Sequence, residues 1–335
     1  MQRKSTTLGL LIALLAAATF GASGAFIKPL LESGWSPAAA VTVRALIGGV
    51  VLAPFALFSL RGRWDAFWRA RWRVLAMALI GVAGTQLVYF AALQRIPVGT
   101  AILIEYMAPL LLVGFAWATS RRMPKAVVLI GSVVALGGLV LVVAPGAKGA
   151  LDILGLVLAV LAMVGCAVYY VVAARPSDGL PPVALAASGL LIGGVVLGLV
   201  GLTHVVPFTA SFAGTHLFGT TVPWFVPLLI VGVIATAIAY AASITASEML
   251  GSRLASFMGL LEVVVATLYA WILLGEDLTI PQLIGGLLIL VGIAFVRSEK
   301  KLDAELEPGE RVELVERRPE PVEGTSPANS PSAPR

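Results

Sequence analysis

Long apolar runs separated by short polar stretches make up most of this 335-residue chain. A bilayer core about 30 Å thick is crossed by roughly 20 residues of helix, which is the length of these runs. They are too long and too continuous for the strands of a membrane barrel, which have about ten residues of alternating character. The pattern predicts an all-α membrane protein with ten transmembrane helices, near residues 7–29, 38–59, 74–93, 98–118, 126–144, 153–173, 183–203, 222–247, 253–274 and 280–297.

Composition supports a membrane protein and separates its last segment from the rest. Hydrophobic residues make up 59% of the chain, and its mean hydropathy is +0.97. Of 41 charged side chains, 15 lie in the last 38 residues, from Ser298 onward. Residues 298–335 mix Glu, Arg, Pro and Ser without an apolar period, so they cannot bury enough surface to offset the entropy of ordering. We expect a disordered cytoplasmic tail there.

Several kinds of chemistry are disfavoured by residue counts alone. The single cysteine, Cys166, excludes an internal disulfide framework and a thiolate metal cluster, and two isolated histidines make a histidine metal site improbable. We expect no metal, no cofactor and no catalytic residues. The net charge of +5 comes from short basic strips between apolar runs, where it is more typical of membrane orientation than of nucleic-acid binding.

The first apolar run could also be a cleavable signal peptide, because it follows Arg3 and Lys4 and ends in small residues. However, its sequence Leu8-Gly9-Leu10 is repeated as Leu154-Gly155-Leu156 in the sixth run. A discarded leader has no reason to copy an internal helix. We therefore interpret the run as a retained first helix.

Basic residues are distributed unequally between the two sets of loops. One set, together with both termini, holds fifteen Lys or Arg residues, including the strip from Arg61 to Arg73, whereas the other holds only Lys28, Arg95 and Lys148. Positively charged loops stay in the cytoplasm, so both termini are predicted to be cytoplasmic. The tryptophans within the basic strip are typical of anchors at the level of the lipid headgroups.

The two halves of the chain resemble each other helix by helix. Five correspondences occur in the same order, with offsets of 145 to 157 residues; examples are Ile47-Gly48-Gly49 with Ile192-Gly193-Gly194, and Glu105 with Glu262. This pattern indicates duplication, with a first repeat over 1–148 and a second over 149–297. Because each repeat has five spans, the second enters the membrane from the opposite side. Inverted repeats are typical of transporters whose substrate site lies between the repeats, near the middle of the membrane.

A set of short motifs resembles the drug/metabolite transporter superfamily. They are Phe20-Gly21-Ala22-Ser23 with Lys28, Arg44, Pro109, and Leu261-Glu262 leading to Leu274-Gly275-Glu276. The ten-helix EamA family is the best match, and the YddG-type amino-acid exporters are the nearest branch. The resemblance implies a proton-driven or facilitated exporter of small metabolites, with a central cavity lined by the first, third, fourth, sixth, eighth and ninth helices. Val263 stands where the family often has proline after the ninth-helix Glu, so no kink is expected there.

Three charged residues lie deep in the predicted helices, where an unpaired charge costs about 2.5 to 3.5 kcal/mol on insertion scales. Glu105 and Glu262 are candidates for carrying a proton or binding a substrate ammonium, and Arg44 for binding a carboxylate. A structural alternative is an Arg44–Glu105 ion pair between the second and fourth helices, because the two residues have similar predicted depths. Aromatic residues with polar tips complete the candidate binding site for an amphipathic guest: Tyr89, Tyr106, Tyr169, Tyr240 and Trp271, with Tyr170 beside them.

These features predict a multi-pass protein of the inner membrane that exports amino acids and related small amphipathic metabolites by alternating access, whether or not protons are coupled. The chain lacks the Gly-x-x-x-x-Gly-Lys motif of ATP-driven pumps. A nucleotide-sugar or organic-phosphate antiporter is an alternative, but phosphate binding requires several basic groups and Arg44 alone is deep. A lipid-modifying enzyme is disfavoured, since acidic and histidine residues do not cluster at one depth.

Overall fold

The computed structural model describes residues 2–96, 98–121, 123–143, 152–175, 179–203, 205–275 and 279–316. Within these ranges, ten helical segments are long and apolar enough to cross a membrane, and each begins and ends within three residues of its predicted position. The ten predicted spans are therefore confirmed. They are Thr6–Glu32, Pro37–Ser59, Arg71–Leu93, Thr100–Ser120, Ala126–Val143, Ile153–Ala173, Pro182–Leu202, Phe225–Leu250, Ser252–Leu274 and Ile280–Ser298.

Six spans are single helices, and four are divided. The single helices are α1 (Gln2–Glu32), α2 (Pro37–Ser59), α8 (Ala126–Val143), α9 (Ile153–Ala173), α10 (Pro182–Leu202) and α15 (Ile280–Glu316). The divided spans are α4 (Arg71–Ala76), the π-helix η1 (Met77–Gly84) and α5 (Thr85–Leu93); α6 (Val98–Glu105) and α7 (Ala108–Ser120); α11 (Phe225–Gly232), the π-helix η3 (Val233–Ile238) and α12 (Ala239–Leu250); and α13 (Ser252–Gly259) and α14 (Leu261–Leu274). The short helix α3 (Trp64–Arg69) lies before α4.

Local sequence explains where several helices begin and end. Ser36 caps α2, its hydroxyl accepting a hydrogen bond from the Ala39 N–H at 3.3 Å, and Pro37 follows at the first helical position, where no N–H partner is needed. Asp152 caps α9 in the same way through the Gly155 N–H at 3.2 Å. At the other end, α14 stops at Gly275, whose φ of +68° is left-handed and therefore suits glycine.

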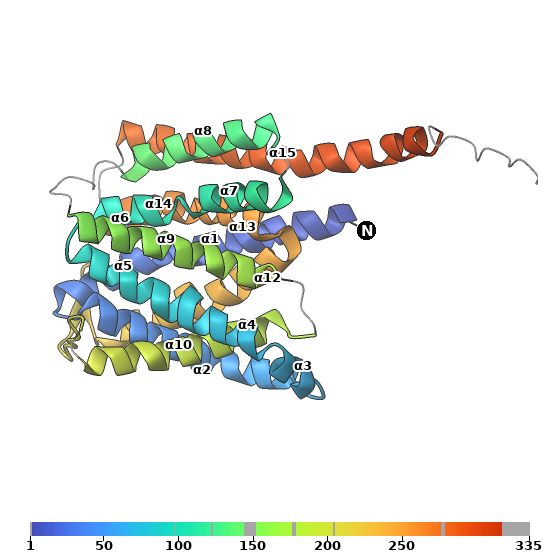
Figure 1. The fold of residues 1–335 in the computed structure, drawn as a ribbon. Coiled ribbons are helices and arrows are strands. Elements are labelled where there is room, and N and C mark those ends of the chain that lie inside the picture. The colour runs from blue at the N-terminus through green and yellow to red at the C-terminus, as the bar shows by residue number, and fades with distance from the viewer. Residues whose placement is uncertain are drawn as a thin grey trace, which may run out of the picture.

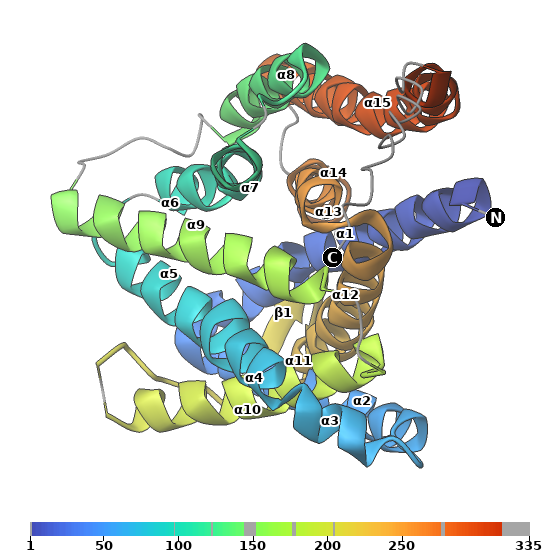
Figure 2. The ribbon, with the colours of Figure 1, turned by 45° about the vertical axis from the view of Figure 1, so that its right-hand side comes forward.

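The helices pack in layers with a pair on each side (Figures 1 and 2). α8 and α15 pack together at one side, and α2 and α10 at the other. Between these pairs, α1 lies against α12 and α14, while α9 lies against α5 and η1. Each of the two central helices, α1 and α9, thus packs mainly on helices from the other half of the sequence.

Glycines allow the outer pairs to approach closely, and their contacts are reciprocal between the halves. A Cβ at Gly131 would lie 2.8 Å from the Gly292 carbonyl oxygen, and one at Gly285 would lie 2.5 Å from the Gly138 carbonyl oxygen. On the other side, Gly49 packs on Leu191 and Gly194 packs on Leu46. Small residues are how membrane helices bring their backbones together, since lipid supplies no hydrophobic drive for association.

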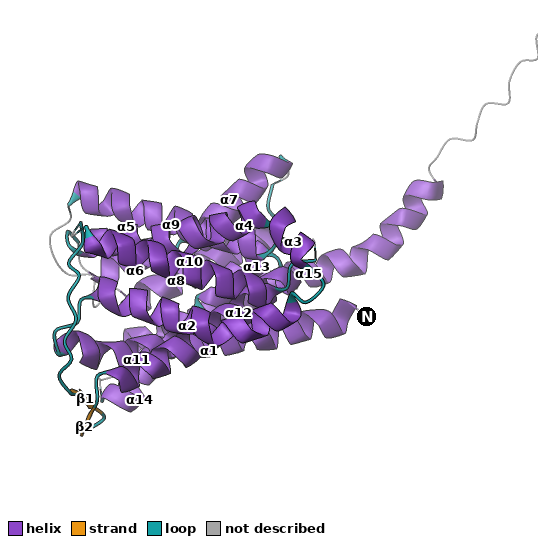
Figure 3. Cartoon of the chain, turned by 90° about the horizontal axis from the view of Figure 1, so that it is seen from below, coloured by secondary structure: helices purple, strands orange, loops and turns teal. Residues whose placement is uncertain are grey.

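A short β-hairpin caps one end of the bundle, opposite the N-terminus (Figure 3). Strands β1 (Thr215–Leu217) and β2 (Thr220–Val222) are antiparallel, with Thr215 opposite Val222. The segment around them is fastened to the turn between α1 and α2. The Thr215 hydroxyl donates to the Pro29 carbonyl at 2.8 Å, the Ser36 and Thr209 backbones are hydrogen-bonded, and the Trp35 ring stacks on Trp224.

The C-terminal helix continues beyond the membrane span. α15 runs to Glu316 and projects from the same end of the bundle as the N-terminus (Figure 1). Residues 298–316 are therefore helical, contrary to the disorder predicted for the whole tail, whereas 317–335 lie outside the described residues. The physical reason is that extending an existing helix avoids the unfavourable nucleation step, so polar residues can continue it. The predicted repeat boundary at 148/149 also falls outside the described residues.

Candidate functional site

The two membrane-embedded glutamates lie beside breaks in their helices. Glu105 is the last residue of α6, and α7 starts three residues later, at Ala108. Glu262 is the second residue of α14, directly after the turn at Leu260 that ends α13. The expectation of an unkinked ninth span is thus wrong: the Leu260 and Val263 amides make i→i−3 bonds, to Phe257 and Leu260, which tighten the turn without proline.

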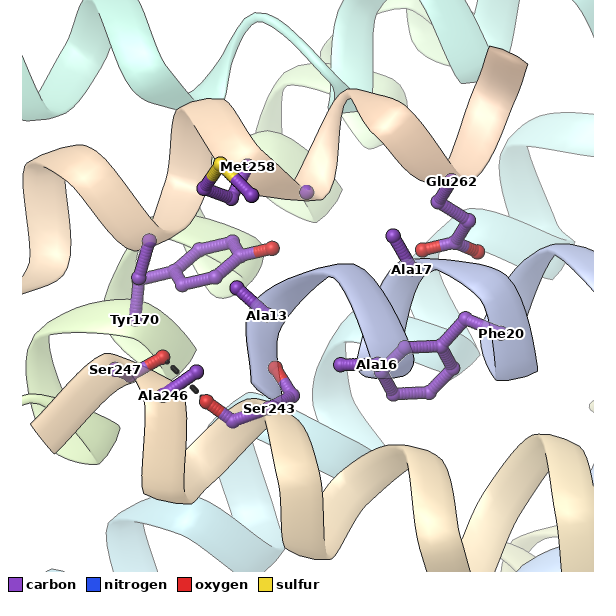
Figure 4. Close-up of a pocket in the computed structure, with 12 residues that line it drawn as sticks. Ala13, Ala16, Ala17, Phe20, Tyr170, Ser243, Ala246, Ser247, Met258 and Glu262 are labelled. Carbon is purple, nitrogen blue, oxygen red and sulfur yellow. Dashed lines mark hydrogen bonds between the residues drawn. The ribbon is translucent and has the colours of Figure 1, made fainter. Parts of the chain in front are cut away.

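Glu262 lines a narrow pocket in the middle of the bundle. In Figure 4 its carboxylate points across the gap towards Ala17 and Phe20 of α1, and the Tyr170 ring projects into the same gap from α9. Its free volume is about 20 Å³, enough for about one water molecule. The lining residues are Ala13, Ala16, Ala17, Phe20, Tyr170, Ser243, Ala246, Ser247, Ala255, Met258, Gly259 and Glu262.

A second, larger hollow of about 410 Å³ lies beside the first along α12 and α13, towards the turn that joins these two helices. It includes Leu250, Gly251 and Leu254, whereas the first pocket includes Ser247 and Ala255. The two hollows are therefore neighbours in the bundle. Arg253 and Thr119 lie on the second one.

Four aromatic rings form a row beside the pocket, each meeting the next edge to face. The ring centroids of Phe20 and Tyr240 are 5.2 Å apart, those of Tyr240 and Tyr169 are 5.9 Å apart, and those of Tyr169 and Tyr170 are 5.2 Å apart. The Tyr169 hydroxyl donates to Ser243 Oγ at 2.9 Å. The row connects α1, α12 and α9, so it crosses between the two halves of the sequence.

Arg44 does not form the predicted ion pair with Glu105. Its Nη1 donates instead to Ser23 Oγ at 3.0 Å, across α2 and α1. Its charge acts on Glu262 and on Tyr240. The two residues were predicted to pair because they have similar depths, but depth along a helix does not specify which face of the bundle a side chain occupies. In the structure, Ser23 on α1 accepts the hydrogen bond from the Arg44 guanidinium.

Glu105 is near Glu262 in the assembled site. The two carboxylates interact electrostatically, and Tyr89 on α5 interacts electrostatically with both of them. The Tyr106 hydroxyl interacts with the Glu262 carboxylate as well. The structure thus brings two acidic groups and their phenolic neighbours together from α5, the α6–α7 break and α14.

Trp271 is separate from this cluster. It follows Glu262 by nine residues on α14, about 14 Å along the helix axis at 1.5 Å per residue, and half of its side chain is exposed. Trp271 is not among the residues that line the pocket. Conversely, sequence reasoning did not select Ser243 and Ser247, although they follow Tyr240 by three and seven residues, a spacing that places all three on one helix face.

The described residues include no group of three or more His, Cys, Asp and Glu side chains close enough to hold a metal ion. The chemistry that the central site does offer is that of carboxylates, phenols and aromatic faces, with one guanidinium nearby. Such groups can bind and release a charged or polar guest and can exchange a proton.

Together, ten membrane-length helices and a central pocket at the break between α13 and α14 define a multi-pass membrane protein with the architecture of a solute transporter. Comparison with known proteins assigns the family. The model of the EamA-like transporter family matches residues 7–144 and again residues 153–298, and the chain belongs to this family. It is thus an EamA-family membrane transporter, which is not a class of enzyme.

Several relatives cover most of the chain. The uncharacterized inner membrane transporter YicL of Salmonella typhimurium is 24% identical over 309 residues, covering 89% of this chain and 97% of the relative. The uncharacterized transporter YvbV of Bacillus subtilis is 26% identical, covering 83% and 85%. A solved structure titled only as the crystal structure of a protein has 20% identity and a TM-score of 0.69, covering 86% of this chain and 96% of its own; it supports the fold alone.

Proposed function

We propose that this EamA-family protein is a secondary transporter that exports amino acids and related small amphipathic metabolites across the inner membrane by alternating access. The observation that carries the proposal is the pocket between the halves, where Glu262 faces aromatic rings at a helix break. Discontinuous helices near the membrane midplane are how transporters expose polar groups to a substrate. The YddG-type exporters remain the proposed branch.

Pseudo-twofold symmetry of the two halves supports alternating access. The contacts of Gly49 with Leu191 and of Gly194 with Leu46 exchange residues related by an offset of 145, as a twofold axis requires. The family model also matches once in each half. Two repeats of opposite orientation can rock about such an axis and expose one site to each side of the membrane in turn.

The described conformation fits an inward-facing state in the proposed topology. The hairpin segment is fastened to the α1–α2 turn at the end opposite the N-terminus. The larger hollow lies at the α12–α13 turn, at the other end. In the proposed topology, a hollow at the terminal end would take up solute from the cytoplasm.

The transport proposal is tested with purified protein in proteoliposomes preloaded with unlabelled amino acids. We expect protein-dependent accumulation of radiolabelled amino acid by exchange, with the solute recovered chemically unchanged. Protein-free vesicles are the control. Chemical conversion of the solute would instead indicate catalysis, and no exchange with any member of a panel of amino acids, dyes and cationic drugs would contradict the proposal.

A phosphate-carrying antiporter is a weaker fit to the site. Arg44 is the one basic residue well inside the described spans, and it donates to Ser23 while its charge acts on Glu262. Phosphate groups are held by several cationic donors at once. A pocket whose charged lining residue is a carboxylate repels them.

The proposed topology predicts opposite labelling at the two ends. In a Cys166→Ala background, Ala210→Cys places a thiol in the exposed hairpin segment, and Asp65→Cys places one on the exposed surface of α3. A membrane-impermeant maleimide should label residue 210 in intact cells and residue 65 only after permeabilisation, because the basic strip around α3 stays in the cytoplasm. The reverse pattern would show that the orientation is wrong.

A further inference from the structure

We propose that the central site selects solutes with a net positive charge, namely organic amines and amino-acid derivatives whose carboxylate is masked, over free zwitterionic amino acids. This inference rests on the proposed transport function and narrows its substrate class. Three features carry it: the charge of the pocket lining, the aromatic surface around it, and the engagement of Arg44.

The pocket lining provides a charged partner for a cation and no charged partner for an anion. Of its twelve residues, all within the described chain, Glu262 is the one that carries a formal charge. The remaining polar groups are the hydroxyls of Tyr170, Ser243 and Ser247, and the Ser247 hydroxyl already donates to the Ser243 carbonyl at 2.7 Å. An ammonium group entering the pocket can pair with the Glu262 carboxylate, while a carboxylate there would meet a like charge.

Two aromatic rings line the pocket that holds the Glu262 carboxylate. Phe20 and Tyr170 line the pocket, and the rings of Tyr169 and Tyr240 complete the row behind them. The faces of such rings carry partial negative charge and attract cations, by about 0.5 to 2 kcal/mol depending on desolvation. They offer no corresponding attraction to a carboxylate.

Arg44, the nearby cation, is not available in the pocket to bind a substrate carboxylate. It is absent from the lining, and its guanidinium donates to Ser23, one helical turn beyond Phe20 on α1. Its charge acts on Glu262 but does not pair with Glu105. A cationic solute beside Glu262 offsets the cost of holding a carboxylate inside the membrane, and a solute that brings its own carboxylate weakens this pairing. A zwitterion would bring a carboxylate into the membrane interior with no cationic partner in the pocket lining, which is costly.

The test uses four solutes that share one phenol ring and differ in charge: trimethyltyramine, which is permanently cationic, tyrosine amide, tyrosine, and 3-(4-hydroxyphenyl)propionate. Exchange uptake is measured in proteoliposomes, and uptake by protein-free vesicles is subtracted. We expect the two cationic solutes to be taken up about tenfold faster than tyrosine or more, a ratio corresponding to roughly 1.4 kcal/mol. The anion should show the least uptake.

Variants of the pocket carboxylate assign the selectivity to Glu262. Glu262→Gln should bring the ratio of tyrosine amide to tyrosine uptake close to one, whereas Glu262→Asp should retain the preference. Glu32→Gln, at the exposed end of α1 and outside the pocket, is the matched control and should leave the ratio unchanged. A monodisperse elution profile identifies folded variants, and the wild-type series is decisive even where a variant does not fold.

The outcomes separate this inference from the transport function itself. Tyrosine uptake equal to or faster than that of both cations overturns the charge selectivity and leaves the transporter assignment intact. A preference that is unchanged in folded Glu262→Gln overturns the role of this carboxylate. No protein-dependent uptake of any of the four solutes, or of the wider panel, contradicts the transport function as well.

Discussion

Replacing Gly138 with leucine is expected to separate α8 from α15 and to destabilise the protein by about 1 to 3 kcal/mol, the usual cost of overpacking. A Cβ at this position would collide with the Gly285 carbonyl oxygen and would lie 2.8 Å from the Ile289 amide nitrogen and 2.9 Å from Leu288 Cβ. Two of these three atoms belong to the backbone, which cannot rotate away as a flexible side chain can. The helices must therefore move apart and lose the close packing on which their association depends.

The adjacent glycine provides a matched control for this prediction. No atom lies within 4 Å of a Cβ built at Gly137, so Gly137→Leu adds the same side chain to the same helix without a clash. Thermal unfolding in detergent, followed by size-exclusion elution with fluorescence detection, should show a lower midpoint for Gly138→Leu than for Gly137→Leu. Equal midpoints would mean that the observed α8–α15 contact is not formed in the membrane protein.

Replacing Glu105 with glutamine is expected to remove most of the pH dependence of transport. If Glu105 takes up and releases the proton, an amide at that position deletes the step, because it has no titratable proton. A transport rate controlled by one titrating group changes by up to about tenfold per pH unit. For a cationic solute the wild-type rate should rise with pH, since the proton and the ammonium compete for the same carboxylates. Exchange in proteoliposomes at equal internal and external pH measures this profile.

Several other ionisable groups interact with the two glutamates and could contribute to the pH dependence of transport. Those that interact with Glu105 or Glu262 are Tyr89, Tyr106, Cys166, Tyr169, Tyr170, Tyr240 and Arg44. Thiols and phenols ordinarily lose their protons at alkaline pH, and arginine keeps its proton throughout the working range, so a pH dependence between about 5 and 8 is assigned to a carboxylate. Glu105→Asp keeps a carboxylate and should retain the slope. A slope that persists in folded Glu105→Gln removes Glu105 as the carrier and transfers the role to Glu262.

Much of the architecture follows from local sequence. The ten spans were predictable because a membrane helix must satisfy its backbone hydrogen bonds internally and must be about as long as the bilayer is thick. The glycine pairs and the duplicated motifs were visible for a similar reason, since small residues at fixed spacing are needed wherever two membrane helices touch. The family followed from short motifs spread over both halves, and the family model confirms it.

The assembled site depended on contacts between residues far apart in the chain. Depth in the membrane suggested an Arg44–Glu105 pair, but the rotation of α2 directs Arg44 to Ser23. Likewise, Trp271 shares a helix with Glu262 and lies about 14 Å from it along the axis. The break before Glu262 forms without proline, through packing of α13 against its neighbours. Hydropathy and periodicity report how far along a helix a residue lies, whereas a binding site also requires the rotation of each helix and the identity of its neighbours, which are set when the helices pack.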